Sequence, residues 1–458
     1  MADQRSADLG SGSVAKLLLT LSLPTITSQV VNMLYNLVDR VYIGHMQPAD
    51  TVGKLALTGV GVCMPLIMII SAFAALVAMG GAPRASIAEG KGDSEQSQKI
   101  MGSCFTLLVG ISIVLTVVFL LFAEPLLLTF GASNNTIDYA LSYMKIYAFG
   151  TIFVQVTLGM NAYITAQGFT MDSMKTVLIG AILNTVLDPI FIFGLRLGVR
   201  GAALATILSQ AVSCLWVLRF LTGSKTKWKL QKQYLRPVPA VFLPCLALGL
   251  SPFIMQSTES LIAVCFNSSL LKYGGDIAVG SMTVLTSIMQ FAMMPLQGLS
   301  QGAQPIISFN FGRRDAQRVK DAFRYLLLIC LGYSLFLWGM VQLFPSAFIH
   351  LFNDDPQLVA YAARALRIYM GTTGLFGIQI ACQQTFVALG NAITSLFLAV
   401  LRKIILLIPL IYILPNFFAD KAFAVFLAEP VADFLAVTTT ATLFFLQFRK
   451  AMFELQQS

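Results

Sequence analysis

Twelve long stretches of apolar residues constrain this chain more than any other feature of its sequence. A membrane-spanning helix needs about 20 mostly apolar residues. Of the 458 residues, 57% are hydrophobic and only 11% are charged, so most of the surface of a soluble fold would be apolar. This balance excludes an ordinary soluble enzyme and a disordered chain. It predicts an all-α polytopic membrane protein with spans at 16–43, 54–80, 100–122, 138–165, 174–195, 200–221, 239–272, 277–303, 322–344, 361–388, 394–414 and 421–447.

The basic residues are distributed unequally between the two sides of these spans. Seventeen lie in the two termini or in the loops on the same side of the membrane as the termini. Five lie in the loops on the other side. Cytoplasmic loops of membrane proteins carry an excess of Lys and Arg, so both termini are expected in the cytoplasm. The net charge of +9 then reflects these loops, and no nucleic-acid partner is expected. The first span follows a short polar N-terminus without a cleavage pattern, so we expect it to be retained.

An internal repeat divides the chain into two halves. Identical residues recur at a constant offset of 222 positions: Pro83 and Pro305, Ser86 and Ser308, Gly90 and Gly312, Asp93 and Asp315, Tyr147 and Tyr369, Gly168 and Gly390. We expect six-helix bundles at 1–222 and 239–458, joined by a basic cytoplasmic linker at 223–238. Bundles with an even number of spans share one orientation, which predicts pseudo-twofold symmetry along the membrane normal and alternating access.

A polar stripe follows one face of the first span. Asn32, Tyr35, Asn36 and Asp39 are spaced at i, i+3, i+4 and i+7, and Gln29 extends the stripe by one turn. Such a stripe faces either the bundle interior or a wet cavity. Hydrogen bonding between helices would explain the amides and the tyrosine. It explains a carboxylate poorly, because an acid at the bilayer centre costs about 2.5–3.5 kcal/mol.

A second polar group lies in the fifth and sixth spans. Asn184 and Asp188 are spaced at i, i+4 and therefore share a helix face. Pro189, which follows them, weakens the helix locally because it lacks a backbone donor. Thr206 of the sixth span lies at a similar depth in the membrane to Asp39. Their oxygens suit a hard cation such as Na⁺. Two close carboxylates in a poorly hydrated site also cannot both ionise easily, so one of them can carry a proton. We predict that Asp39, Asn184, Asp188 and Thr206 couple transport to H⁺ or Na⁺, a choice that the residue types leave open.

The second half contains three further acids within spans. Glu259, flanked by Gln256, is a second candidate coupling residue. Glu429 and Asp433 are spaced at i, i+4, and we expect one of them to form a structural ion pair with Arg402 or Lys403 of the preceding span.

Motifs for other chemistry are absent from the sequence. There is no phosphate-binding loop of the form G-x-x-x-x-G-K-[ST], and GKGD at 90–93 does not match it. The seven cysteines all lie in predicted spans without metal-ligand or disulfide spacing. No serine, histidine and acid form a recognisable catalytic set. We therefore expect no enzymatic activity and no cofactor beyond the coupling ion.

Several segments resemble the multidrug and toxic compound extrusion (MATE) family, especially its MepA-like bacterial branch. They are NMLYNLVDRVYIGH at 32–45, LNTVLDPIFIFGLRLGVRGAALAT at 183–206, MMPLQGLSQGAQPIISFNFGRRDAQRVKDAFR at 293–324 and ALGNAITSLFLAVLRKIILLIPLIYILP at 388–415. The resemblance implies a twelve-helix antiporter that exports organic cations or amphipathic drugs in exchange for H⁺ or Na⁺. It implies a multi-pass monomer in the bacterial cytoplasmic (inner) membrane, in contact with lipid, which contributes to antibiotic resistance.

The resemblance also assigns roles to individual residues. The coupling ion would be carried by Asp39 with Asn184, Asp188 and Thr206. Asn32 and Asn161 would lie near the drug, and together with the polar stripe and Gln256 they form the expected substrate cavity. The acid that some members carry in the tenth span is missing here, where Gln379 and Gln383 stand instead. This difference favours coupling in the first half.

Two other functions are consistent with parts of the sequence. A lipid or saccharide flippase of the same superfamily would need a larger and more basic cavity for phosphates than the first half offers. An intramembrane enzyme would need a catalytic set, which the sequence lacks.

Overall fold

The computed structural model describes residues 7–46, 52–352 and 354–457, and helices are the only regular secondary structure in these ranges. Among these residues, nine helices are long and apolar enough to cross a membrane, or ten if the bent pair α4 and α5 is one span. Every predicted span coincides with helical structure, and one 74-residue helix, α8, covers two of them across a break at Gly275. The chain is a multi-pass membrane protein.

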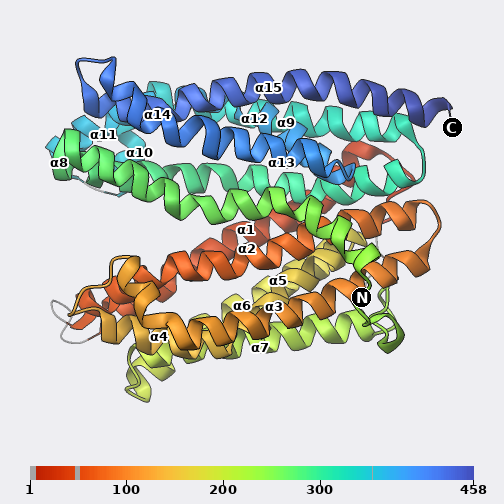
Figure 1. Cartoon of the computed structure of the whole chain (residues 1–458), viewed down its shortest axis with the longest axis horizontal. Coiled ribbons are helices and arrows are strands. Elements are labelled where there is room, and N and C mark those ends of the chain that lie inside the picture. Colours follow the sequence, from red (N-terminus) through yellow and green to blue (C-terminus); the bar gives the residue numbers. More distant parts are fainter. Residues whose placement is uncertain (1–6, 47–51, 353, 458) are drawn as a thin grey trace. The chain divides into compact units, whose positions relative to one another are not determined.

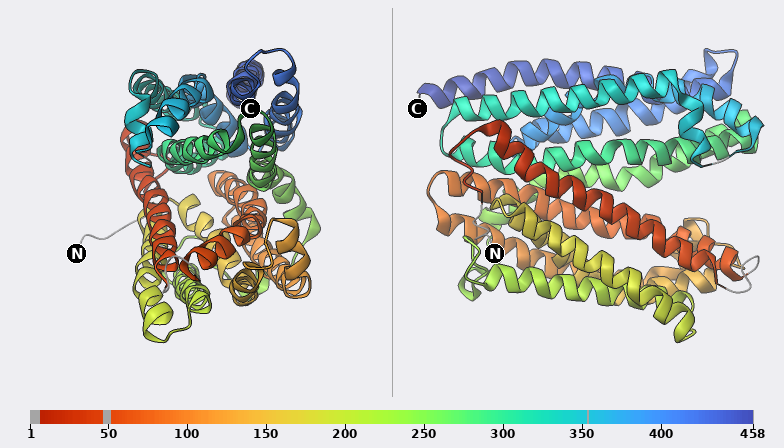
Figure 2. Two further views of the ribbon diagram at one scale, coloured as in Figure 1. Left: turned by 90° about the vertical axis from the view of Figure 1, so that its left-hand side faces the viewer. Right: turned by 180° about the vertical axis from the view of Figure 1, so that it is seen from behind.

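The helices cluster into two units. Unit 1 comprises Met1–Asp8 and Leu23–Gly249, and unit 2 comprises Leu9–Ser22 and Leu250–Ser458. In unit 1 the helices run side by side, and the left-hand view of Figure 2 looks roughly along them. They are α2 (Lys54–Gly90), α3 (Ser94–Thr129), α4 (Ile137–Phe149), α5 (Thr151–Ala166), α6 (Thr170–Pro189) and α7 (Val199–Thr222), with most of α1 (Val14–Gly44).

Unit 2 consists of the remaining helices and the start of α1. In Figure 1, α9, α12 and α15 extend alongside one another. The helices are the larger part of α8 (Pro239–Gly312), α9 (Ala316–Leu343), α10 (Pro345–His350), α11 (Pro356–Tyr369), α12 (Phe376–Ala388), α13 (Ala392–Val400), α14 (Ile408–Ile413) and α15 (Lys421–Gln457). A π-helical segment, Leu401–Leu407, connects α13 to α14.

The repeat found in the sequence recurs in the backbone. Asp93 caps α3 by accepting a hydrogen bond from Gln96 N, and Asp315, 222 positions later, caps α9 by accepting one from Arg318 N. Left-handed backbone angles also recur at this offset, with φ of 86° at Gly168 and 77° at Gly390. The matched sequences therefore adopt matched turns.

Two of the predicted spans are broken where continuous helices were expected. The span at 138–165 bends by 57° between α4 and α5, where Gly150 lies against the side chain of Ile207. The span at 361–388 is interrupted between α11 and α12 by a short 3₁₀ turn at Thr373–Leu375. The repeat matches Tyr147 with Tyr369. Helix α4 ends two residues after Tyr147, and helix α11 ends at Tyr369, so the two breaks occupy nearly equivalent places in the two halves.

The basic linker is attached to unit 1. The side-chain oxygen of Gln167 accepts three hydrogen bonds, from Thr226 Oγ1, Lys227 N and Trp228 N, at 2.8–2.9 Å. The indole of Trp228 is only 1% exposed and donates to Glu89 Oε2 at 2.9 Å. These contacts attach the predicted linker to the first bundle, in agreement with its assignment to unit 1.

The segment before α1 is held by unit 2 in a comparable way. Arg318 donates to the carbonyl oxygens of Leu9, Ser11 and Gly12 at 2.8–3.3 Å. Asn310 Nδ2 adds a hydrogen bond to Leu9 O at 2.8 Å. Helix α1 therefore starts in unit 2 and continues into unit 1 from Leu23, next to Pro24, which removes one helical backbone donor.

Candidate functional site

The polar cluster in unit 1 depends on close packing between α6 and α7. A side chain at Gly180 would place its Cβ 2.8 Å from Ser213 Oγ, and one at Gly201 would place it 2.7 Å from the backbone of Phe191. Only glycine permits such an approach without displacing the neighbour. Beyond Pro189, α6 continues as a π-helical turn at Ile190–Gly194. Turns of this type occur frequently beside functional sites.

This packing brings the predicted residues of α6 and α7 together. Asn184 Nδ2 lies 3.4 Å from Asp188 Oδ1 and 3.3 Å from Thr206 Oγ1, which donates its own hydrogen to Ala202 O at 3.0 Å. The Asp39 carboxyl of α1 is close enough to the Asp188 carboxyl for the two groups to interact electrostatically. Two adjacent carboxyl groups in a buried site cannot both ionise easily.

Three oxygens of this cluster are buried and lack a hydrogen-bond partner among the described residues. They are Asp39 Oδ1, Asn184 Oδ1 and Asp188 Oδ2. The three residues are 7%, 2% and 0% exposed, so bulk water does not compensate them. An uncompensated buried polar atom is costly and calls for a ligand, a proton or a bound water. The donor set consists of hard oxygens and fits H⁺ or an alkali cation.

The cluster does not extend to a transition-metal site. Within the described ranges, no three His, Cys, Asp or Glu side chains gather in a way that could hold a metal ion. The two carboxylates, one amide and one hydroxyl provide a small, all-oxygen environment. Oxygen ligands of this kind suit hard cations better than soft transition metals.

Tyrosines on α4 border the cluster, and the sequence reasoning missed them. Tyr143 interacts with the hydroxyl of Thr206 and, electrostatically, with Asp39. Its ring stacks on Tyr147 with centroids 6.0 Å apart. The i, i+4 spacing of two tyrosines on an apolar helix was the available signal. The two tyrosines are only 2% and 5% exposed, so both rings are buried.

The other residues of the α1 stripe lie at the margin of the cluster. Tyr35 is half-buried and close enough to Asp39 and Asp188 to interact electrostatically. Gln29 and Asn32 are also half-buried, whereas Asn36 is exposed and donates to Asn32 O at 2.7 Å. This face of α1 is thus only partly covered by protein.

The two other predicted cavity residues, Asn161 and Gln256, belong to different units. Asn161 of α5 donates to Ser173 O at 3.3 Å, and its own side-chain oxygen is buried without a partner among the described residues. Gln256 belongs to unit 2, where it is half-buried on α8.

The three acids that lie within predicted spans of unit 2 are paired with internal cations. Arg402 contacts both Asp433, at 2.6 Å, and Glu429, at 3.2 Å, and Lys403 contacts Glu259 at 2.6 Å. Arg402 and Lys403 both lie in the π-helical segment Leu401–Leu407. The structural ion pair predicted for Arg402 with Glu429 or Asp433 is present with both acids. Glu259 has a built-in counter-ion, unlike Asp39 and Asp188.

We expect the glycine contact between α6 and α7 to be needed for the site. Gly201→Ala adds a Cβ against the Phe191 backbone and should cost about 1–3 kcal/mol, as overpacking does. The melting temperature in detergent should fall. Gly110→Ala is the matched control, because Gly110 in α3 has no atom within 4 Å of its added Cβ. Equal melting temperatures for the two variants would contradict this packing.

Comparison with known proteins identifies the class of this membrane protein. The family model described as MatE matches residues 24–190 and 252–413, which include parts of both units and three of the four residues of the cluster, all but Thr206. The chain belongs to the MatE (MATE) family. The resemblance noted in the signature segments is therefore confirmed over most of the chain.

Individual relatives agree with this assignment. The chain is 26% identical over 440 residues to a protein of Staphylococcus haemolyticus (strain JCSC1435) named multidrug export protein MepA, with 95% of each chain covered. Among solved structures, an outward-facing multidrug resistance MATE family transporter of the MOP superfamily gives a TM-score of 0.88 at 23% identity, covering 98% of both chains. A MOP superfamily transporter from Pyrococcus furiosus also gives 0.88, at 22% identity and 100% coverage of both chains. These structural likenesses establish the fold.

Proposed function

We propose that this protein is a cation-coupled antiporter that exports organic cations or amphipathic drugs by alternating access. Its membership of the MATE family and its similarity to relatives named multidrug export proteins support export of drugs. The observation that carries the coupling is the set of three unpartnered buried oxygens on Asp39, Asn184 and Asp188.

The chemistry of this cluster suits an exchange of ligands. An entering cation or proton compensates one of the two negative charges that Asp39 and Asp188 would carry, and so lowers the cost of two adjacent buried carboxylates. Asn184 and Thr206 supply neutral oxygens, so the ion is held without a large surplus of charge and can be released. Tyr143 limits access of water to the site. Because one site binds the ion in one state and releases it in another, ion entry can drive substrate exit.

We also propose the setting in which this exchange occurs. The excess of basic residues beside the termini supports a cytoplasmic location for both ends, in the bacterial inner membrane. The proposal requires no enzymatic step, no cofactor other than the coupling ion, and no partner protein. A monomer is sufficient, because the cluster is complete within unit 1.

Drug transport in proteoliposomes tests the proposal. Purified protein is reconstituted, and uptake of an aromatic organic cation is followed under an imposed H⁺ gradient or an imposed Na⁺ gradient, each applied separately. At least one gradient should accelerate uptake, and the effective gradient identifies the ion. Uptake that is indifferent to both gradients would contradict coupling. Translocation of a lipid pyrophosphate in the absence of drug uptake would favour a flippase instead.

A further inference from the structure

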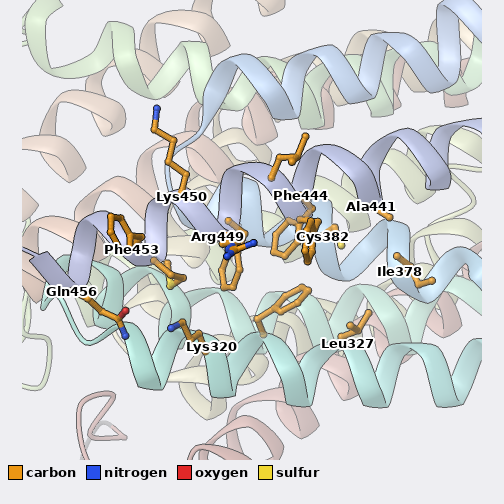
Figure 3. Close-up of a pocket in the computed structure, with 15 residues that line it drawn as sticks. Lys320, Leu327, Ile378, Cys382, Ala441, Phe444, Arg449, Lys450, Phe453 and Gln456 are labelled. Atoms are coloured by element: carbon orange, nitrogen blue, oxygen red, sulfur yellow. The ribbon is translucent and has the colours of Figure 1, made fainter.

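A cavity of about 860 Å³ lies on unit 2, away from the charged residues described above. It is formed by α9, α12 and α15, and Figure 3 shows its lining side chains. All the residues around it belong to one unit. The cavity shares no residue with the Asp39 cluster and plays no part in the proposed ion exchange.

Most of the cavity wall is apolar and aromatic. Phe323 of α9 stacks on Phe444 of α15 with ring centroids 4.4 Å apart, and Phe448 lies 4.7 Å from Phe444. Leu327 and Ile378 continue the apolar surface toward the middle of the helices. The wall also includes Phe445 and Leu446, which are 66% and 61% exposed. Exposed apolar side chains on a membrane-spanning helix face the lipid, so the cavity opens toward the bilayer.

One end of the cavity is basic. Lys320 lies near the start of α9, and Arg449 near the end of α15. Lys320 comes two residues before the span predicted at 322–344, and Arg449 two residues after the one at 421–447. Both cations therefore lie at the depth of the phosphate groups. Neither forms an ion pair with an acid in the described part of the chain, whereas the neighbouring Lys450 lies 3.9 Å from Glu454.

The dimensions agree with those of one lipid leaflet. Eight residues separate Ala441 from Arg449 on α15, and at 1.5 Å per residue this corresponds to about 12 Å. Half of the hydrocarbon core measures about 15 Å. An acyl chain that enters along α9 and α15 would thus remain within one leaflet, with its head group beside Lys320 and Arg449.

We propose that this cavity is a binding site for an anionic phospholipid of the surrounding bilayer. The phosphate binds between Lys320 and Arg449, and one acyl chain lies along Leu327, Ile378 and Ala441. The basic end disfavours the cationic molecules proposed as export substrates. A lipid is favoured over a free phosphate, because a phosphate alone would leave the aromatic wall unoccupied.

Native mass spectrometry of the full chain in detergent tests this proposal. The wild-type protein is titrated with phosphatidylglycerol or with phosphatidylcholine, and bound lipid is counted. Each basic residue near an anionic lipid contributes about 1 kcal/mol, or about fivefold in affinity. Lys320→Gln combined with Arg449→Gln should therefore weaken phosphatidylglycerol binding about 25-fold and leave the weaker phosphatidylcholine binding unchanged.

Two further variants make the test specific. Lys272→Gln with Lys421→Gln removes the same charge from two exposed lysines of unit 2 that lie near Tyr273, and it should leave binding unchanged. Ala441→Phe fills the apolar part of the cavity and should weaken phosphatidylglycerol binding without changing any charge. Glycerol phosphate should not displace the lipid. Equal weakening in the lysine control, no effect of Ala441→Phe, or displacement by glycerol phosphate would overturn the proposal.

Discussion

Asp39→Asn is expected to abolish drug resistance in cells that express the protein, while the variant still reaches the membrane. Asparagine has nearly the same shape as aspartate, but it neither releases a proton nor neutralises a cation. One monovalent cation crossing 100 mV supplies about 2.3 kcal/mol, which supports roughly fifty-fold export of a neutral substrate. The variant should therefore maintain no difference in drug concentration across the membrane. Growth in drug and the amount of protein in isolated membranes are the two measurements.

Asp138→Asn is the matched control for this experiment. Asp138 lies in the first turn of α4 in the same unit, and its side chain is exposed and outside the cluster. Cells with this variant should keep wild-type resistance. Wild-type resistance in cells with Asp39→Asn would remove Asp39 from the coupling mechanism.

Arg402→Met should be among the most destabilising substitutions in unit 2. The side chains of Glu429 and Asp433 are only 6% and 3% exposed, and Arg402 is the cation that contacts both. Removing one partner of a buried ion pair typically costs 3–5 kcal/mol, because a charge remains buried without compensation. We expect a much lower melting temperature in detergent and less protein in the membrane.

Two other variants separate the charge effect from a general loss of packing. Lys403→Met should cost less, because its partner Glu259 has a side chain that is 51% exposed and is therefore less deeply buried than Glu429 and Asp433. Combining Arg402→Met with Glu429→Gln and Asp433→Asn removes the uncompensated charge and should restore most of the lost stability. If the triple variant were as unstable as Arg402→Met, the arginine would act through packing, for example on the Phe376 ring 4.6 Å away.

Much of the coupling cluster could be predicted from the sequence. The i, i+4 spacing of Asn184 and Asp188 placed them on one face, and counting residues from the span ends placed Asp39 and Thr206 at a similar depth. These inferences depend only on helix geometry, which is local. The roles of the residues in coupling remain predictions until they are tested.

Other features could not be predicted, because they depend on tertiary contacts. The bend at Gly150 occurs where Ile207 of α7 packs closely against the backbone, and the approach of Tyr143 to Asp39 joins two different helices. The π-helical turns at Ile190–Gly194 and Leu401–Leu407 have no signal in apolar periodicity. Likewise, the start of α1 belongs to unit 2, and Arg318 of that unit binds the segment that precedes α1. These contacts join residues far apart in the sequence, so no local pattern indicates them.

Ion movement driven by substrate alone tests the coupling role of the Asp39 cluster most directly. Proteoliposomes are loaded with an aromatic organic cation and diluted without any ion gradient, and trapped dyes report internal pH and Na⁺. For the wild-type protein and Asp138→Asn, exit of the substrate should draw H⁺ or Na⁺ inward. Asp39→Asn and Asp188→Asn should remove this counterflow. Substrate exit without ion movement in the wild type, or undiminished counterflow in both carboxylate variants, would contradict the assignment of the coupling site.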